Sequence, residues 1–169
     1  EIASCLVGSE MCIRDRGNYQ VNVTQLAQAQ TLSTAGQTSK TATIGSGTTT
    51  TISFQFGTIS GGTLSNGVYT GASFAQDANQ ATGTVTINSS NNSLQGIRDA
   101  INAANIGVTA TLVSDGSATP DRLVFTSNKT GETSSMKITV EGDAAIQSLM
   151  EYDPAGVQNL KQNLSLIHI

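Results

Sequence analysis

The feature that most constrains the fold of this 169-residue chain is a series of short segments in which apolar and polar residues alternate. An alternation with a period of two is typical of strands that bury one face. Turn-forming glycine, serine, asparagine and aspartate residues separate the segments. Residues 57–82, rich in Gly, Ser, Asn and Ala, are interpreted as a long loop or a weak hairpin. The alternation predicts strands at residues 19–26, 41–44, 49–56, 84–87, 108–113, 123–126 and 136–140.

A different period begins after residue 93. Leu94, Ile97 and Ile101 recur at spacings of three and four, which places them on one face of a helix. Asn92 and Gln95, three positions apart, are the expected capping pair at the start of this helix. The sequence therefore predicts one amphipathic helix among the strands.

The residues after this helix indicate how the chain returns to strand. Gly107 stands where a left-handed residue commonly closes a helix, and Val108 opens the next expected strand. Residues 144–150 predict one or two further helical turns. Short strands joined by turns around an inserted helix predict an α+β fold that is predominantly β. We expect two small β-rich subdomains, the second of them a β-α-β-β unit.

The two ends of the sequence differ from the body between them. One codon choice for residues 164–169 has a reverse complement that, read one base along, encodes residues 11–16. We therefore expect residues 1–16 and 164–169 to be translated sequencing adapter without a fold of their own. Both cysteines and the single histidine lie in these ends, as Cys5, Cys12 and His168.

Without these ends, the body at residues 17–163 has no imidazole or thiol for a catalytic triad, a thiol nucleophile or a usual zinc site. A carboxylate-pair hydrolase remains as an enzyme alternative, because nine acidic residues (12 minus three) stay in the body. Asp115 and Asp121 flank a loop that superficially suggests calcium, but it lacks the alternating ligands of such loops. We interpret it as a turn between strands, and expect no metal and no cofactor.

Charge and hydropathy exclude two classes of partner. The body carries six basic residues (8 minus two) against nine acidic ones and has no basic cluster, which argues against nucleic acid. No stretch approaches the roughly 18 apolar residues of a membrane span, which argues against membrane insertion.

Two segments carry a resemblance to a known family. SLQGIRDAINAANIGVTATLVSDG at residues 93–116, followed by DRLVFTSNKTGE at 121–132, resembles the flagellin hook IN motif. The Ile-Asn pair that names the motif is Ile101 and Asn102 here. YQVNVTQLAQAQTL at 19–32 is similar to the stretch that follows the N-terminal coiled coil of flagellar filament cap proteins. Both segments in this order point to the cap family, although the chain lacks the family's terminal heptad-patterned segments.

The resemblance implies a structural, non-enzymatic protein that oligomerises into a cap at the filament tip and assists the insertion of flagellin. Its implied partners are flagellin, further copies of itself and the hook-filament junction proteins. Its implied location is extracellular, at the tip of a bacterial flagellum, after export by the flagellar type III apparatus. In this scheme residues 17–82 are a β-rich part of the cap head, 83–150 the hook IN subdomain and 151–163 the start of the return segment.

Five residues are candidates for the structural core of the motif, namely Leu94, Ile97, Ile101, Asn102 and Val108. Asn102 is expected to tie backbone groups near the helix end rather than to bind a ligand.

An alternative function is an adhesin-like head that binds host glycans or mucin through its polar surface. The body lacks tryptophan, and its few aromatic residues mostly occupy expected core positions, which disfavours that alternative.

Overall fold

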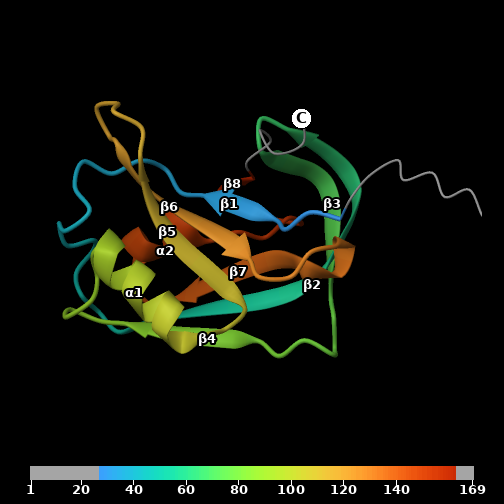
Figure 1. Ribbon diagram of the computed structural model, residues 1–169, viewed down its shortest axis with the longest axis horizontal. Coiled ribbons are helices and arrows are strands. Elements are labelled where there is room, and N and C mark those ends of the chain that lie inside the picture. Colours follow the sequence, from blue (N-terminus) through green and yellow to red (C-terminus); the bar gives the residue numbers. More distant parts are fainter. Residues whose placement is uncertain (1–26, 163–169) are drawn as a thin grey trace, which may run out of the picture.

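The computed structural model describes residues 27–162, which form two antiparallel sheets with two α-helices (Figure 1). The strands are β1 (Thr31–Ser33), β2 (Thr50–Ser65), β3 (Val68–Gln76), β4 (Gly83–Ile87), β5 (Val108–Ser114), β6 (Asp121–Ser127), β7 (Ser135–Glu141) and β8 (Lys161–Gln162). The helices are α1 (Leu94–Ala104) and α2 (Ala144–Met150), with a short 3-10 turn, η1 (Glu132–Ser134), before β7.

The strand order shows how distant parts of the chain meet. One sheet has the order β5-β6-β1-β8, and the other has β3-β2-β4 with β7 also paired to β2. Ile52 of β2 is in register with Val85 of β4 on one side and with Val140 of β7 on the other. β2 is therefore the central strand of the second sheet, and β5 and β3 are edge strands.

The inward faces of both sheets and both helices share one hydrophobic cluster. Along β2 the alternation expected from sequence is observed, because Ile52, Phe54 and Phe56 are buried while Thr51, Ser53 and Gln55 between them are partly exposed. Phe54 of one sheet meets Phe125 of the other edge to face, with ring centroids 6.1 Å apart. The prediction of an α+β, predominantly β fold is confirmed.

The order β4-α1-β5-β6 gives the expected strand-helix-strand-strand sequence, but its strands are divided between the two sheets. β4 pairs with β2, whereas β6 pairs with β1. Both sheets thus combine strands from either side of the division placed between residues 82 and 83. The assignment of 17–82, 83–150 and 151–163 as separate parts stays a prediction.

Four of the predicted strands are confirmed with slightly different ends, as β4, β5, β6 and β7, and so is the short helix α2. The strand predicted at 49–56 is confirmed as β2, which continues further, to Ser65. The strand predicted at 41–44 is wrong. Thr43 makes an isolated bridge to Ser93, and Ile44 is held by Asn92 through a backbone bond and a side-chain bond instead of by a neighbouring strand. The strand predicted at 19–26 and the adapter assignment of both ends concern residues outside the described range.

Residues 57–82 contain a hairpin, the second of the two interpretations, and it is longer and more regular than expected. β2 continues to Ser65, and a two-residue turn at Asn66 and Gly67 leads into β3. Both turn residues have positive φ, 51° and 81°, as the tight turns favoured in hairpins require. The hairpin arches over one end of the molecule (Figure 1).

Candidate functional site

The N-terminus of α1 is capped one residue later than expected. The Ser93 hydroxyl accepts a hydrogen bond from the Gly96 N–H at 3.1 Å, so Ser93 is the cap rather than Asn92. Asn92 is engaged elsewhere, because its side-chain amide donates to the Ile44 carbonyl at 3.0 Å. The predicted pair of Asn92 and Gln95 is therefore wrong, and Asn92 instead holds the segment before β2.

The C-terminus of α1 also closes before the expected glycine. Asn105, with φ of 48°, is the left-handed residue directly after the helix. Gly107 has a positive φ as well, and its carbonyl accepts a hydrogen bond from the Asn128 N–H at 2.9 Å. Asn105 therefore ends the helix, while Gly107 turns the chain into β5.

The buried face of α1 consists of the three residues whose spacing predicted the helix. Leu94, Ile97 and Ile101 are fully buried and belong to the cluster that also contains Val108 and Ala110 of β5. Burial of a large aliphatic side chain contributes about 1.5–3 kcal/mol. The helix is thus fixed on the sheet mainly by apolar packing.

Asn102 joins α1 to the edge of β5. Its amide nitrogen donates to the Ala110 carbonyl at 2.9 Å, and its amide oxygen accepts from the Ala110 N–H at 2.8 Å. The side chain therefore meets both backbone groups of one residue, as a neighbouring strand would. One N–H donor and one oxygen lone pair of the amide are thus engaged by the strand backbone.

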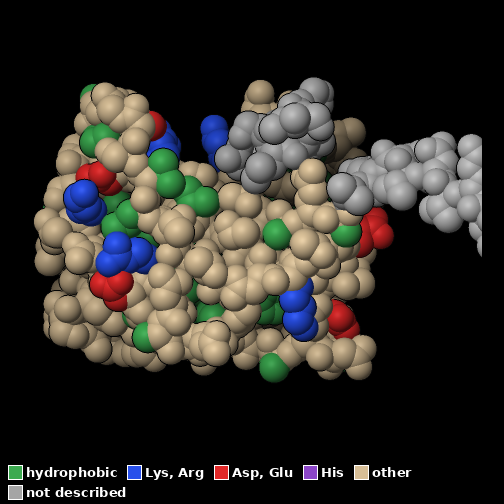
Figure 2. Space-filling view, in the orientation of Figure 1, with side chains coloured by type: hydrophobic (Ala, Val, Ile, Leu, Met, Phe, Trp, Pro, Cys, Tyr) green, Lys and Arg blue, Asp and Glu red, His purple; other side chains and the backbone are tan. Residues whose placement is uncertain are grey.

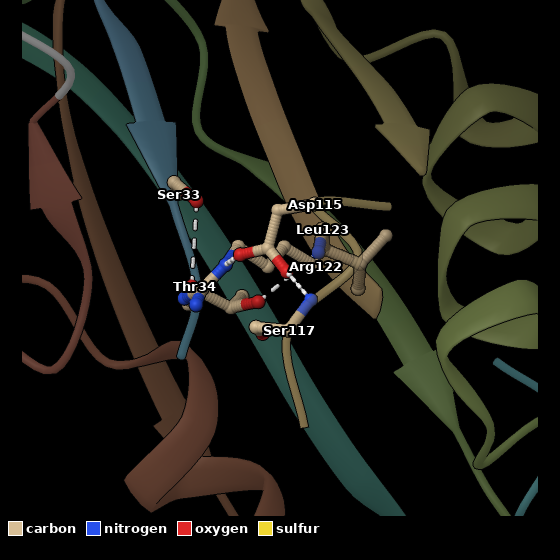
Figure 3. A network of polar contacts seen from close by, with 6 residues as sticks. All are labelled: Ser33, Thr34, Asp115, Ser117, Arg122 and Leu123. Atoms are coloured by element: carbon tan, nitrogen blue, oxygen red, sulfur yellow. Dashed lines mark hydrogen bonds and ion pairs between the residues drawn. The ribbon is translucent and has the colours of Figure 1, made fainter. Parts of the chain in front are cut away.

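The loop between β5 and β6 is tied to the end of β1 by the network in Figure 3. Asp115 accepts from the Ser117 N–H at 3.0 Å and from Arg122 Nε at 2.8 Å. Arg122 also donates to the Thr34 carbonyl, and the Thr34 hydroxyl accepts from the Leu123 N–H at 3.0 Å. The bonds from Ser117, with help from Arg122, hold the pKa of Asp115 well below its usual range.

Both acidic residues that flank this loop have partners within the fold. The Asp115 carboxylate is occupied by the turn and by the guanidinium, while Asp121 exchanges two backbone hydrogen bonds with Gln37. Among residues 27–162, no group of three or more His, Cys, Asp or Glu side chains could hold a metal ion.

A shallow polar hollow of about 590 Å³ lies where the loops after β3 and β6 meet. Asp77 at its side accepts bonds from the Asn79 N–H and the Gln80 side chain, which lower the pKa of that carboxyl. The hollow offers amide, hydroxyl and ammonium groups but no paired carboxylates. It is lined by Asp77, Asn79, Gln80, Asn128, Lys129, Thr130, Thr133 and Ser134.

Comparison with known proteins assigns this arrangement to a family. Residues 74–129, which include α1, β5 and β6, match the family model described as the flagellin hook IN motif. The flagellar hook-associated protein 2 of Escherichia coli strain K12 is 36% identical over 143 residues, which cover 85% of this chain and 26% of that protein. The crystal structure of the D2-D3 domains of the Escherichia coli flagellar cap protein FliD superimposes with a TM-score of 0.67 and 32% identity, covering 84% of this chain and 63% of that one.

The chain belongs to the flagellar cap protein family. A further member of the family, the B-type flagellar hook-associated protein 2 of Pseudomonas aeruginosa, is 42% identical over 82 residues, 45% of this chain and 17% of that protein. The chain spans about a quarter of the length of the curated Escherichia coli relative, 26%. Nothing in these comparisons supports the alternative of an adhesin-like glycan-binding head.

No helix among the described residues is long and apolar enough to cross a membrane.

Proposed function

We propose that this chain is part of the head of a bacterial flagellar filament cap, a structural protein that oligomerises at the filament tip and assists flagellin assembly. The observation that carries the proposal is the 143-residue similarity to hook-associated protein 2, together with the shared fold of the FliD D2-D3 domains. The five motif residues, Leu94, Ile97, Ile101, Asn102 and Val108, then have a structural role in holding α1 on the sheet.

The partners in this proposal are flagellin, further copies of the protein and the hook-filament junction proteins. Its place is the extracellular tip of the flagellum, reached through the flagellar type III apparatus. The surface supports such a role. In Figure 2 charged side chains are scattered singly or in small groups over a surface made mostly of uncharged side chains and backbone, and only 12% of the residues are charged.

The proposal includes no enzymatic activity and no cofactor. The carboxylates described above act as turn and capping groups, since Asp77 and Asp115 each accept hydrogen bonds from residues two positions further along. A hydrolase would instead require two carboxyl groups facing each other across a cleft.

A chimera tests the proposal. In the Escherichia coli relative, the segment that aligns with this chain is replaced by residues 27–162, and the chimera is expressed in cells that lack their own cap protein. We expect flagellin to be found in filaments in these cells, and we expect control cells without any cap protein to release it unassembled into the medium. The measurement is the ratio of filament-bound to free flagellin.

Two matched variants control for folding of the chimera. Ile97→Asp places a charge in the core and is expected to abolish filament growth, because an unpaired buried charge is strongly destabilising. Val113→Asp places the same charge on the exposed face of β5 and is expected to leave growth unchanged. A folded, exported chimera that leaves flagellin free in the medium would contradict the proposal.

A further inference from the structure

Side-chain amides occupy outward-facing backbone groups on three strands of this molecule. On β5, Asn102 bonds both the N–H and the carbonyl of Ala110. On β3, Gln158 does the same for Tyr69, accepting from its N–H at 2.7 Å and donating to its carbonyl at 3.0 Å. On β7, the Gln30 amide oxygen accepts from the Met136 N–H.

Ala110 lies where the cover over the outer edge of β5 ends, because Val108 and Ala110 are only 3% and 1% exposed, whereas Leu112 is half-buried and Ser114 is exposed. In β5 the register with β6 and the alternation of an antiparallel pair direct the backbone groups of residues 109, 111 and 113 toward β6. Those of 108, 110, 112 and 114 therefore point away from the sheet. Asn102 stands at the second of these four positions, so an incoming strand meets an occupied site near the centre of the edge.

The edge of β3 is interrupted in the same way. Gln158 occupies Tyr69 near the hairpin turn, and Gly71, with φ of 71°, breaks the extended backbone two residues later. A left-handed residue inside a strand increases the local twist and disturbs the backbone locally, although the pairing of β3 with β2 resumes at Ala72. An approaching strand therefore finds no long, flat run of free backbone groups on β3.

These edges lack the usual protection by charge. Exposed edge strands invite pairing with other chains, and proteins commonly block them with charged side chains, lysine above all. Neither β5 (VTATLVS) nor β3 (VYTGASFAQ) contains a charged residue. In a chain with only 12% charged residues, another kind of group must block the edges.

We propose that Asn102 and Gln158 are edge-blocking residues, which imitate a neighbouring strand at one position and so prevent β5 and β3 from pairing with other copies of the chain. Asn102 thus has a second role besides attaching α1 to the sheet. Self-association through the sheet edges is suppressed, and any assembly of the protein is left to other surfaces.

Three variants of the 169-residue chain test the proposal under reducing conditions, which keep Cys5 and Cys12 from forming intermolecular disulfides. Asn102→Leu removes the amide and leaves an uncharged open edge. Asn102→Asp also loses the bond to the Ala110 carbonyl, but puts a charge at the edge. Gln95→Leu makes the same amide-to-leucine change at an exposed position of α1. The readout is the mass distribution in sedimentation velocity over a hundredfold range of concentration, relative to the unchanged chain.

We expect only Asn102→Leu to shift toward dimers and larger species as concentration rises, with Asn102→Asp and Gln95→Leu matching the unchanged chain. A folded Asn102→Leu variant without added association would overturn the proposal. Equal association of the Leu and Asp variants would overturn it as well, because lost stability rather than an open edge would then be the cause. If Asn102→Leu does not fold, Gln158→Leu and Gln158→Glu supply the same comparison on β3.

Discussion

Asp143 caps α2 and at the same time fastens the turn before β2. Its carboxylate accepts from the Ser46 N–H at 2.6 Å, the Ser46 hydroxyl at 2.7 Å and the Ala145 N–H at 2.8 Å. These bonds, led by those of Ser46, lower the pKa of Asp143 below its ordinary value of 3.8. One side chain therefore connects two segments almost a hundred residues apart.

The lowered pKa predicts a pH dependence of stability. A carboxyl group whose pKa is lower in the folded state stabilises the fold above its unfolded pKa, and this contribution is lost as the pH falls through the folded pKa. We expect the free energy of unfolding of the unchanged chain to fall as the pH drops below about 4. In Asp143→Asn we expect a smaller fall in the free energy of unfolding. Ser46→Ala keeps the bond from the Ser46 N–H and loses only that from the hydroxyl, so its fall is intermediate. Urea unfolding across this range measures it, and equal pH slopes in all three proteins would contradict the account.

At the scale of a single element, the cap of α1 can be tested directly. Ser93→Ala removes the hydroxyl that accepts from Gly96 and is expected to cost about 1 kcal/mol of stability. Gln95→Ala is the control. The capping pair suggested by the sequence would give the Gln95 side chain a stabilising role at the start of α1, whereas in the structure the cap is formed by Ser93 and Gly96. We expect Gln95→Ala to change the free energy of unfolding by no more than about 0.5 kcal/mol. Urea unfolding would contradict this assignment if Gln95→Ala were the more damaging change.

The β2–β3 hairpin offers a matched pair of glycines. Gly62 and Gly71 have nearly the same φ, 70° and 71°, but a Cβ at Gly62 would lie 2.6 Å from the Ala72 nitrogen, whereas one at Gly71 would meet nothing within 4 Å. Gly71→Ala carries only the left-handed conformational cost of about 1–2 kcal/mol. Gly62→Ala adds the clash, so we expect a clearly larger loss in thermal unfolding. Equal losses would show that the close approach is absent.

Local patterns predicted most elements but missed their ends and partners. The spacing of Leu94, Ile97 and Ile101 gave the helix, because burial of one face leaves a periodic trace in sequence. The far half of the hairpin was uncertain because its residues are exposed or only partly buried on both faces, so no alternation distinguishes it from a loop. The cap was misplaced by one residue because Asn92 and Ser93 are both good caps, and only the contact with Ile44 decides between them.

At the scale of the whole molecule, the long-range contacts could not be derived from spacing. The bonds from Gln158 to Tyr69 and from Gln30 to Met136 join residues about ninety or more positions apart, and glutamines of this kind are common throughout the chain. The division at residue 82 rests on local patterns alone and stays a prediction, because a sequence pattern shows strands but not which strand each one pairs with.

This interleaving of strands predicts that the second predicted subdomain does not fold alone. In a fragment of residues 83–162, β4 and β7 lose β2, with which both pair in the complete sheet, and β6 loses β1. We expect residues 27–162 to give a dispersed amide spectrum by nuclear magnetic resonance and residues 83–162 a collapsed one. A dispersed spectrum from the shorter fragment would establish the division that the sequence suggested.

The proposed role of this fold is to form the head of a filament cap. Electron cryo-microscopy of filament tips from cells that express the chimera tests it most directly. We expect density at the tip into which the two sheets, with α1 packed on β5, can be placed in several copies. Tips without such density, in cells that export the folded chimera, would contradict it.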